Sequence, residues 1–117
     1  MKVKYKKGFP IPKGYSGITL WPFGIYIRYE YTTEKLVNHE KIHWKQQQEL
    51  LGISFYILYG IFYLINLFRY QFVSQAAYYN NPFEKESYNN EDNEKYLSTR
   101  PKFKWFQYFL YEYRFKK

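Results

Sequence analysis

His39-Glu40-Lys41-Ile42-His43 lies within a stretch, residues 34–51, whose apolar side chains recur at helical spacing. Residues four apart on a helix lie on one face, so His39 and His43 can direct their ring nitrogens at one point. Glu40 lies about 100° further round the helix axis, close enough to reach a group held at that point. The chain has no other histidine. The stretch therefore predicts a helix that presents two imidazoles and a carboxylate to one shared site.

The predicted helix has a clear start and a one-sided pattern. Thr33 is a suitable N-cap, and Glu34 is favourable in the first turn. Both histidines fall on the broad side that carries the apolar residues and should face the core. One interpretation is a pair of hydrogen-bonded core histidines. The spacing of four, with Glu40 between them, favours the other interpretation, a metal site.

Zinc chemistry explains why these residue types would stand together. The ion lowers the pKa of a bound water, and Glu40 would accept the water's proton as general base. The chain has no cysteine, so its zinc ligands must be histidine, carboxylate and water. Two histidines do not complete a catalytic site, which needs a third protein ligand. The candidates that follow in the sequence are Glu84, Glu86, Glu91 and Glu94, together with Asp92, the only aspartate.

Length, charge and composition limit the classes of protein to which this chain can belong. A length of 117 residues suits one domain with one modest core. The net charge of +8 predicts an anionic partner or surface, and most of the excess lies in residues 2–13 and 102–117. Solvated basic termini are the simpler explanation of that charge. No nucleic-acid-binding motif accompanies it, so nucleic-acid binding is a minor hypothesis.

The first third of the chain predicts β-structure. Residues 1–16 are basic and rich in Pro and Gly, which favours an extended, loosely ordered arm. Residues 17–31 alternate apolar and polar side chains around a Pro22-Phe23-Gly24 turn, which predicts a β-hairpin. We therefore expect a single domain over residues 17–117, preceded by the arm.

Residues 50–68 contain no charged side chain and are long enough, at about 28 Å as a helix, to cross a bilayer. A semi-polar stripe (Tyr56, Tyr59, Tyr63 and Asn66) favours a helix packed inside the protein instead. A span here would also separate His43 from every later Glu by a membrane. We therefore expect a helix folded back against residues 34–51. Its apolar residues should be buried in the core or in a partner interface: Ile53, Ile57, Ile61 and Leu64.

Further helices are expected towards the C-terminus. Asn81 is a good N-cap and Pro82 suits the first helical position, so a helix should run from there to about residue 96. Residues 102–113 fit both a helix and a strand, and a helix is favoured. The predicted fold class is α+β: a short hairpin followed by three to four helices. Glu84 would then be either a zinc ligand or a capping-box residue that accepts from the backbone N–H of Asn81.

The motif and the residues that follow it resemble a known family. His39-Glu40-x-x-His43 followed by a helix bearing a Glu is similar to the gluzincins, a branch of the zincin metallopeptidases. In one group of these the ligand Glu is followed three residues later by a small residue, usually Ala, and Ser87 follows Glu84 in this way. The stretches 38–50 and 81–88 further resemble small zincin-like proteins of bacteria and their tailed phages. The resemblance covers residues 21–105 and implies a zincin fold, with zinc held by His39, His43 and Glu84.

The function expected from these residues is zinc-dependent hydrolysis of a peptide bond, with Glu40 as base and later acid. Arg100 or the tyrosines around the site could stabilise the oxyanion: Tyr78, Tyr79 and Tyr88. The rival is a non-enzymatic protein, such as a phage virion component, that keeps a zincin-like scaffold. The N-terminus lacks the apolar stretch of a secretory signal peptide, so a cytoplasmic or phage-associated location is expected, with peripheral membrane attachment as an alternative.

Overall fold

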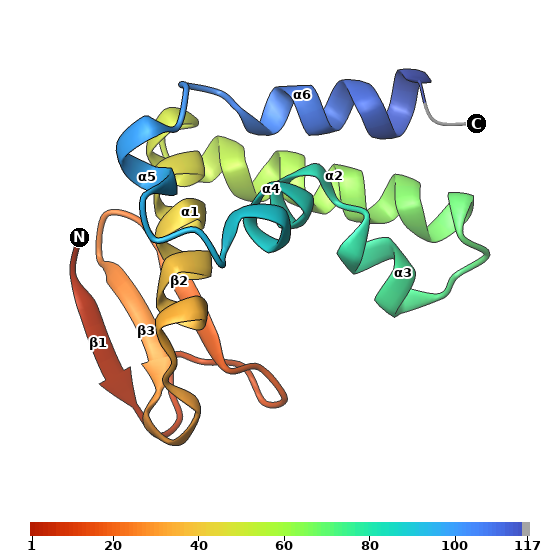
Figure 1. Ribbon diagram of the computed structural model, residues 1–117. Coiled ribbons are helices and arrows are strands. Elements are labelled where there is room, and N and C mark those ends of the chain that lie inside the picture. Colours follow the sequence, from red (N-terminus) through yellow and green to blue (C-terminus); the bar gives the residue numbers. More distant parts are fainter. Residues whose placement is uncertain (116–117) are drawn as a thin grey trace.

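Three short strands form one sheet in the computed structural model, which describes residues 1–115 (Figure 1). The strands are β1 (Val3–Lys6), β2 (Gly17–Leu20) and β3 (Gly24–Arg28), in the order β1-β3-β2. β2 and β3 are antiparallel, as the predicted hairpin requires, and the backbone N–H of Phe23 closes the turn onto the carbonyl of Leu20 at 2.7 Å. Together with the six α-helices of the described residues, the sheet gives the α+β class expected from the sequence.

The basic N-terminal segment is extended but is not a loose arm. β1 pairs in parallel with β3, with Val3 opposite Ile25. The guanidinium group of Arg28 donates to the carbonyls of Lys7 and Tyr15, at 2.6 and 2.7 Å. Ile11 is buried. The sequence prediction missed this because strand pairing and the Arg28 contacts join residues that lie far apart in the chain.

Helix α1 (Glu34–Glu49) follows a short 3-10 helix, η1 (Tyr29–Tyr31), and carries the histidine pair. The Thr33 hydroxyl accepts from the backbone N–H of Leu36 at 3.0 Å, which confirms the predicted N-cap. After α1 the chain turns through Leu51 and Gly52, both left-handed, with φ of 56° and 77°. It then enters α2 (Ile53–Arg69), whose axis is bent by 111° from that of α1.

Among the described residues, no single helix is both long enough and apolar enough to be a membrane span. Helices α1 and α2 meet these two criteria only when taken together, as a bent pair.

The face of α2 that was expected in the core or in a partner interface does not lie in the core, and the opposite face points inward. The predicted core residues Ile53 and Ile57 are 75% and 57% exposed, and Ile61 and Leu64 are 46% and 56% exposed. The buried residues of α2 are Phe55, Phe62 and Asn66.

Polar partners inside the domain explain the inverted orientation of α2. Asn66 donates to the carbonyl of Ala77 at 3.1 Å and accepts from the Tyr113 hydroxyl at 2.7 Å. The tyrosine hydroxyls also find partners, as expected: Tyr56 donates to the Thr19 carbonyl, Tyr59 to Glu84, and Tyr63 shares a hydrogen bond with Ser74. Since each polar group is satisfied, burying this face costs little desolvation energy.

In the described part of the chain, five further helices follow α2, of which α3, α4 and α6 lie beside it (Figure 1). They are α3 (Ser74–Tyr79), α4 (Pro82–Asn90), α5 (Tyr96–Thr99), α6 (Trp105–Leu110) and the π-helical η2 (Tyr111–Phe115). Asn81 caps α4 as predicted, with its side chain accepting from the backbone N–H of Phe83 at 3.1 Å. α4 ends at Asn90 and not near residue 96, and residues 102–113 are largely helical.

The hydrophobic core lies between α2, α4 and α6. Phe83 of α4 is fully buried, and its ring centroid lies 4.6 Å from that of Phe55 and 4.8 Å from that of Trp105. Phe62 completes this aromatic cluster. The cluster fixes α4, and with it Glu84, against α2 and α6.

The orientation of α2 can be tested by a matched pair of substitutions. Phe62→Ala should lower the free energy of unfolding by about 3–5 kcal/mol, because it leaves a cavity in the aromatic cluster. Ile57→Ala should change it by roughly 0.5 kcal/mol or less, because Ile57 is exposed. Urea denaturation followed by circular dichroism measures both. A large loss for Ile57→Ala would show that the isoleucine face is buried in solution.

Candidate metal centre

Two imidazoles and one carboxylate meet between α1 and α4. Glu84 Oε1 lies 3.1 Å from Nε2 of His39 and 3.0 Å from Nε2 of His43. All three side chains are buried. The structure thus brings together the three residues that the resemblance implied as ligands, although Glu84 lies 41 positions after the nearer histidine.

The other nitrogen of each ring is also held. His39 Nδ1 lies 2.8 Å from Glu91 Oε2, and His43 Nδ1 lies 2.8 Å from Gln46 Oε1. The amide nitrogen of Gln46 donates to the carbonyl of Phe83 and to Glu86, which fixes the orientation of that amide. Since carboxylate and amide oxygens only accept, each Nδ1 carries a proton.

This arrangement places an acceptor on both sides of each histidine ring. With Nδ1 protonated, a neutral imidazole presents a lone pair at Nε2, and that lone pair would face the lone pairs of the Glu84 carboxylate. A proton or a cation must therefore lie between each Nε2 and Glu84 Oε1. The geometry fits a site for a positive charge, and a metal ion would satisfy all three groups at once.

The charges of the site reinforce one another. Burial alone would raise the pKa of Glu84, but the imidazoles, His43 above all, hold it well below its usual range. Burial would likewise lower the pKa of His43, but the Glu84 carboxylate raises it to about 9. The second oxygen of Glu84 accepts from the Tyr59 hydroxyl at 2.6 Å. Glu84 is therefore an ionised carboxylate that needs positive charge beside it.

Glu40 lies next to this cluster but has a different anchor. The Thr19 hydroxyl of β2 contacts Glu40 Oε1 at 2.7 Å and the Glu40 carbonyl at 3.0 Å. His39, Glu40 and His43 offer ligand atoms within 4.8 Å of one another, so Glu40 could in principle be the third ligand. Of the described residues, only Glu84 contacts both Nε2 atoms, and Glu40 is turned to Thr19, so Glu84 suits that position better.

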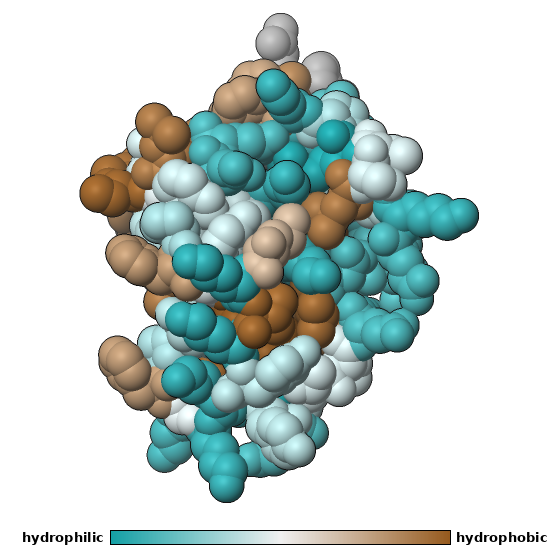
Figure 2. Space-filling view, turned by 90° about the vertical axis from the view of Figure 1, so that its left-hand side faces the viewer, coloured by the Kyte–Doolittle hydropathy of each residue, from teal (hydrophilic) through white to brown (hydrophobic). Residues whose placement is uncertain are grey.

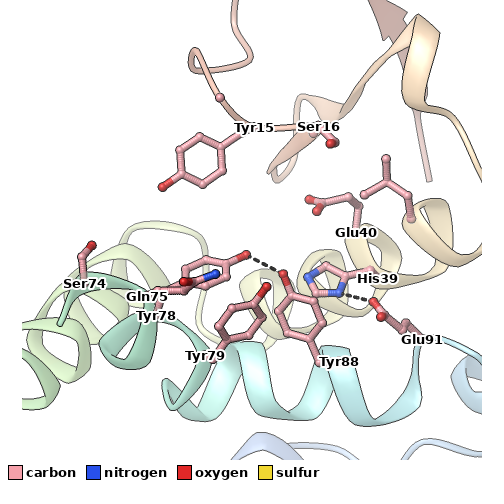
Figure 3. Close-up of a pocket in the computed structure, with 13 residues that line it drawn as sticks. Tyr15, Ser16, His39, Glu40, Ser74, Gln75, Tyr78, Tyr79, Tyr88 and Glu91 are labelled. Atoms are coloured by element: carbon pink, nitrogen blue, oxygen red, sulfur yellow. Dashed lines mark hydrogen bonds and ion pairs between the residues drawn. The ribbon is translucent and has the colours of Figure 1, made fainter. Parts of the chain in front are cut away.

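Two cavities reach the cluster, and Figure 3 shows the larger of them. One of about 480 Å³ is lined by His39, Glu40 and Glu91, by the loop at Tyr15 and by tyrosines of α3 and α4. The other, of about 280 Å³, is more apolar and exposes Glu40, His43 and Glu84 beside Phe55 and Tyr56. Glu40 borders both cavities, so a molecule in either one would lie close to its carboxylate.

The residues expected to stabilise an oxyanion divide into two groups. Arg100 lies outside the site, because its guanidinium is paired with Glu86 and Glu49. The tyrosines Tyr78, Tyr79 and Tyr88 line the larger cavity (Figure 3). The hydroxyls of Tyr78 and Tyr88 are hydrogen-bonded to each other at 3.1 Å. The cavity therefore has phenol donors but no arginine.

The other candidate ligands have their own roles. Glu86 accepts from Gln46, Arg100 and Tyr96, Glu91 contacts His39 from behind, and Asp92 and Glu94 are exposed. The capping-box alternative for Glu84 is not formed, since the backbone N–H of Asn81 donates to the carbonyl of Tyr78 at 3.2 Å.

Three supporting residues were missed by sequence reasoning: Thr19, Gln46 and Tyr59. Gln46 could have been found, because it lies three residues after His43 on the same helical face. Thr19 and Tyr59 reach the site from β2 and α2, and no local pattern marks them. Comparison of the chain with protein-family models, curated proteins and solved structures found no match.

Removing the anchor behind His39 should weaken metal binding without unfolding the protein. Glu91→Ala leaves the Nδ1 proton of His39 without its carboxylate, which should lower zinc affinity about 10- to 100-fold. Asp92→Ala is the matched control, because Asp92 is exposed and lies near Lys35 only. Competition with a chromogenic chelator measures both. Equal affinities for the two variants would contradict the anchoring role of Glu91.

Proposed function

We propose that this protein is a zincin-like, zinc-dependent metallopeptidase. One observation carries the proposal: the Nε2 atoms of His39 and His43 converge on a single oxygen of Glu84, while acceptors behind both rings keep Nδ1 protonated. This is the arrangement in which two neutral imidazoles and one carboxylate share a divalent cation.

The distances between the ligand atoms support zinc. Zinc binds imidazole nitrogen and carboxylate oxygen at about 2.0–2.2 Å in tetrahedral sites, which places two ligand atoms roughly 3.4 Å apart. The two nitrogen–oxygen separations observed here, 3.1 and 3.0 Å, are only slightly shorter. A set of two nitrogens and one oxygen without thiolate is also the set typical of catalytic zinc, which leaves a further position open.

The residues around the ligands suit hydrolysis of an amide bond. Bound zinc supplies Lewis-acid chemistry, polarising a carbonyl and activating water. The Glu40 carboxylate, held in place by Thr19, would accept a proton from that water and deliver it to the leaving nitrogen. Glu40 borders both cavities, so it can reach a peptide bond presented from either side.

Other residues would position these groups. Tyr59 would hold Glu84 in its ligand orientation through the 2.6 Å hydrogen bond. The phenol groups of Tyr78 and Tyr88 line the larger cavity and could donate to the oxygen that gains negative charge. Ser87, which is fully buried, leaves room for α4 to lie close to α1.

A second candidate is an assembly protein that keeps the scaffold without catalysis. The exposed apolar face of α2 favours it, since large exposed apolar surfaces mark interaction sites. The two candidates differ in what they require of Glu40. An enzyme needs its carboxylate, whereas an assembly protein does not.

Metal content tests the ligand set. The purified wild-type protein should contain one zinc ion per chain, and His39→Ala and Glu84→Ala should each lose it, because two protein ligands hold zinc far more weakly than three. Lys41→Ala, within the same motif, should retain the metal. Inductively coupled plasma mass spectrometry gives the ratio. Full zinc occupancy in Glu84→Ala would remove Glu84 from the ligand set.

Substitution of Glu40 separates metal binding from chemistry. Glu40→Gln should keep the zinc and the fold but lower peptidase activity by roughly 10²–10⁴-fold, because an amide does not accept the water's proton. Glu34→Gln, an exposed change on the same helix, should leave activity unaltered. A fluorogenic peptide library gives the rates. Undiminished turnover by Glu40→Gln would exclude Glu40 as base. Zinc-loaded wild type that cleaves no peptide would favour the assembly protein.

A further inference from the structure

The outer face of α2 is an apolar stripe with no cover among the described residues. It comprises Ile53, Ile57, Ile61, Leu64, Phe68 and Phe72, six side chains that are each between 46% and 75% exposed. Its first five members follow helical spacing along α2, which is 17 residues or about 25 Å long, and Phe72 lies three residues beyond the helix. Soluble monomers rarely present so continuous an apolar surface, and such a surface is typical of an interaction site.

Both ends of the stripe are held in an unusual backbone conformation. Leu51, just before α2, and Phe72, just after it, have positive φ values of 56° and 63°. These are left-handed turns that close helices: the backbone N–H of Gly52 donates to the carbonyl of Gln47 after α1, and that of Phe72 donates to the carbonyl of Leu67 after α2. Both side chains are exposed, and the ring of Phe72 lies 5.1 Å from that of Phe68. The fold thus holds apolar groups outward at each end of the helix.

The charge of the surface indicates what would cover the stripe. Among the described side chains, nine Lys and Arg are exposed but only four acidic residues are: Glu30, Glu34, Asp92 and Glu94. The other six acidic residues are buried or partly buried inside the domain. The surface is therefore strongly cationic, and two copies of the chain would repel one another. An anionic surface would be attracted.

The exposed acidic groups also lie away from α2. Glu34 and Glu94 line one cavity at the N-terminal end of α1, whereas α2 begins beyond its C-terminal end and is bent away by 111°. Figure 2 shows a face dominated by hydrophilic side chains, with hydrophobic ones at its left edge and in a patch near its centre. The apolar stripe can therefore approach an anionic surface without bringing exposed carboxylates to it.

We propose that the outer face of α2 seats the protein on an anionic phospholipid membrane, with the helix lying in the plane of the interface. The stripe would enter the boundary between headgroups and acyl chains, as amphipathic interfacial helices do. Phe68, Phe72 and Tyr56 would occupy the headgroup level that aromatic rings prefer. The polar face of α2 would remain on the domain, so the zinc site and its cavities would stay outside the lipid.

Vesicle flotation tests the proposal with the full chain. Wild type should float with vesicles of phosphatidylcholine containing about one third phosphatidylglycerol, and bind phosphatidylcholine alone at least about tenfold less well. The variant Ile57→Gln/Ile61→Gln/Leu64→Gln should lose binding to the anionic vesicles by about tenfold or more. The matched control Ile57→Leu/Ile61→Leu/Leu64→Met should bind like wild type. Circular dichroism and urea unfolding should be alike for all three proteins, because these positions are exposed.

Three results would overturn the proposal. If wild type does not bind anionic vesicles, the protein does not bind such a membrane. If the glutamine variant floats as well as wild type, the α2 face is not the contact. If light scattering shows a wild-type dimer that the glutamine substitutions dissociate, and no vesicle binding is seen, the face is an interface between copies. None of these outcomes depends on zinc content or peptidase activity, so they test the membrane proposal independently of the proposed function.

Discussion

The contact between one carboxylate oxygen of Glu84 and two imidazoles is the interaction on which the rest of the structure depends. It joins α1 to α4 in the interior, where an isolated carboxylate would be strongly destabilising. Its neighbours form successive layers of hydrogen bonds: Glu91 and Gln46 behind the histidines, then Glu86, Arg100 and Glu49 behind Gln46. Among the described side chains only the indole N–H of Trp105 is buried without a partner, so this network is almost fully satisfied.

A polar interior between α1 and α4 determines how the hydrophobic residues are used. Apart from Ile42, the buried residues of α1 are polar or ionisable, so this helix contributes little to an apolar core. The aromatic cluster of Phe55, Phe62, Phe83 and Trp105 adjoins this polar interior, since the Phe55 ring lies 6.1 Å from that of His43. That cluster occupies the space between α2, α4 and α6. The aliphatic residues of α2 are therefore left outside, although they are among the most hydrophobic in the chain.

Features set by neighbouring residues could be predicted from the sequence. The Thr33 and Asn81 caps, the β2–β3 hairpin and the shared face of the two histidines all follow from local spacing. The inward face of α2 could not be predicted, because it depends on whether Tyr59 and Asn66 find partners more than ten residues away. The same holds for the pairing of β1 with β3 and for the Thr19 contact. Periodicity identifies an amphipathic helix, but it does not decide which face is buried when both faces contain large side chains.

The sheet matters to the site because polar side chains hold its edge strand. Gln47 of α1 accepts from the backbone N–H of Trp21 and donates to the carbonyl of Thr19, at 2.7 and 2.8 Å, so it pairs with β2 much as a neighbouring strand would. Tyr56 of α2 donates to the same carbonyl. β2 is thus fixed to both helices, and the Thr19 hydroxyl is fixed with it. The position of Glu40 therefore depends on the sheet, although Glu40 and both histidines belong to one helix, and this explains why a small sheet is needed beside a largely helical site.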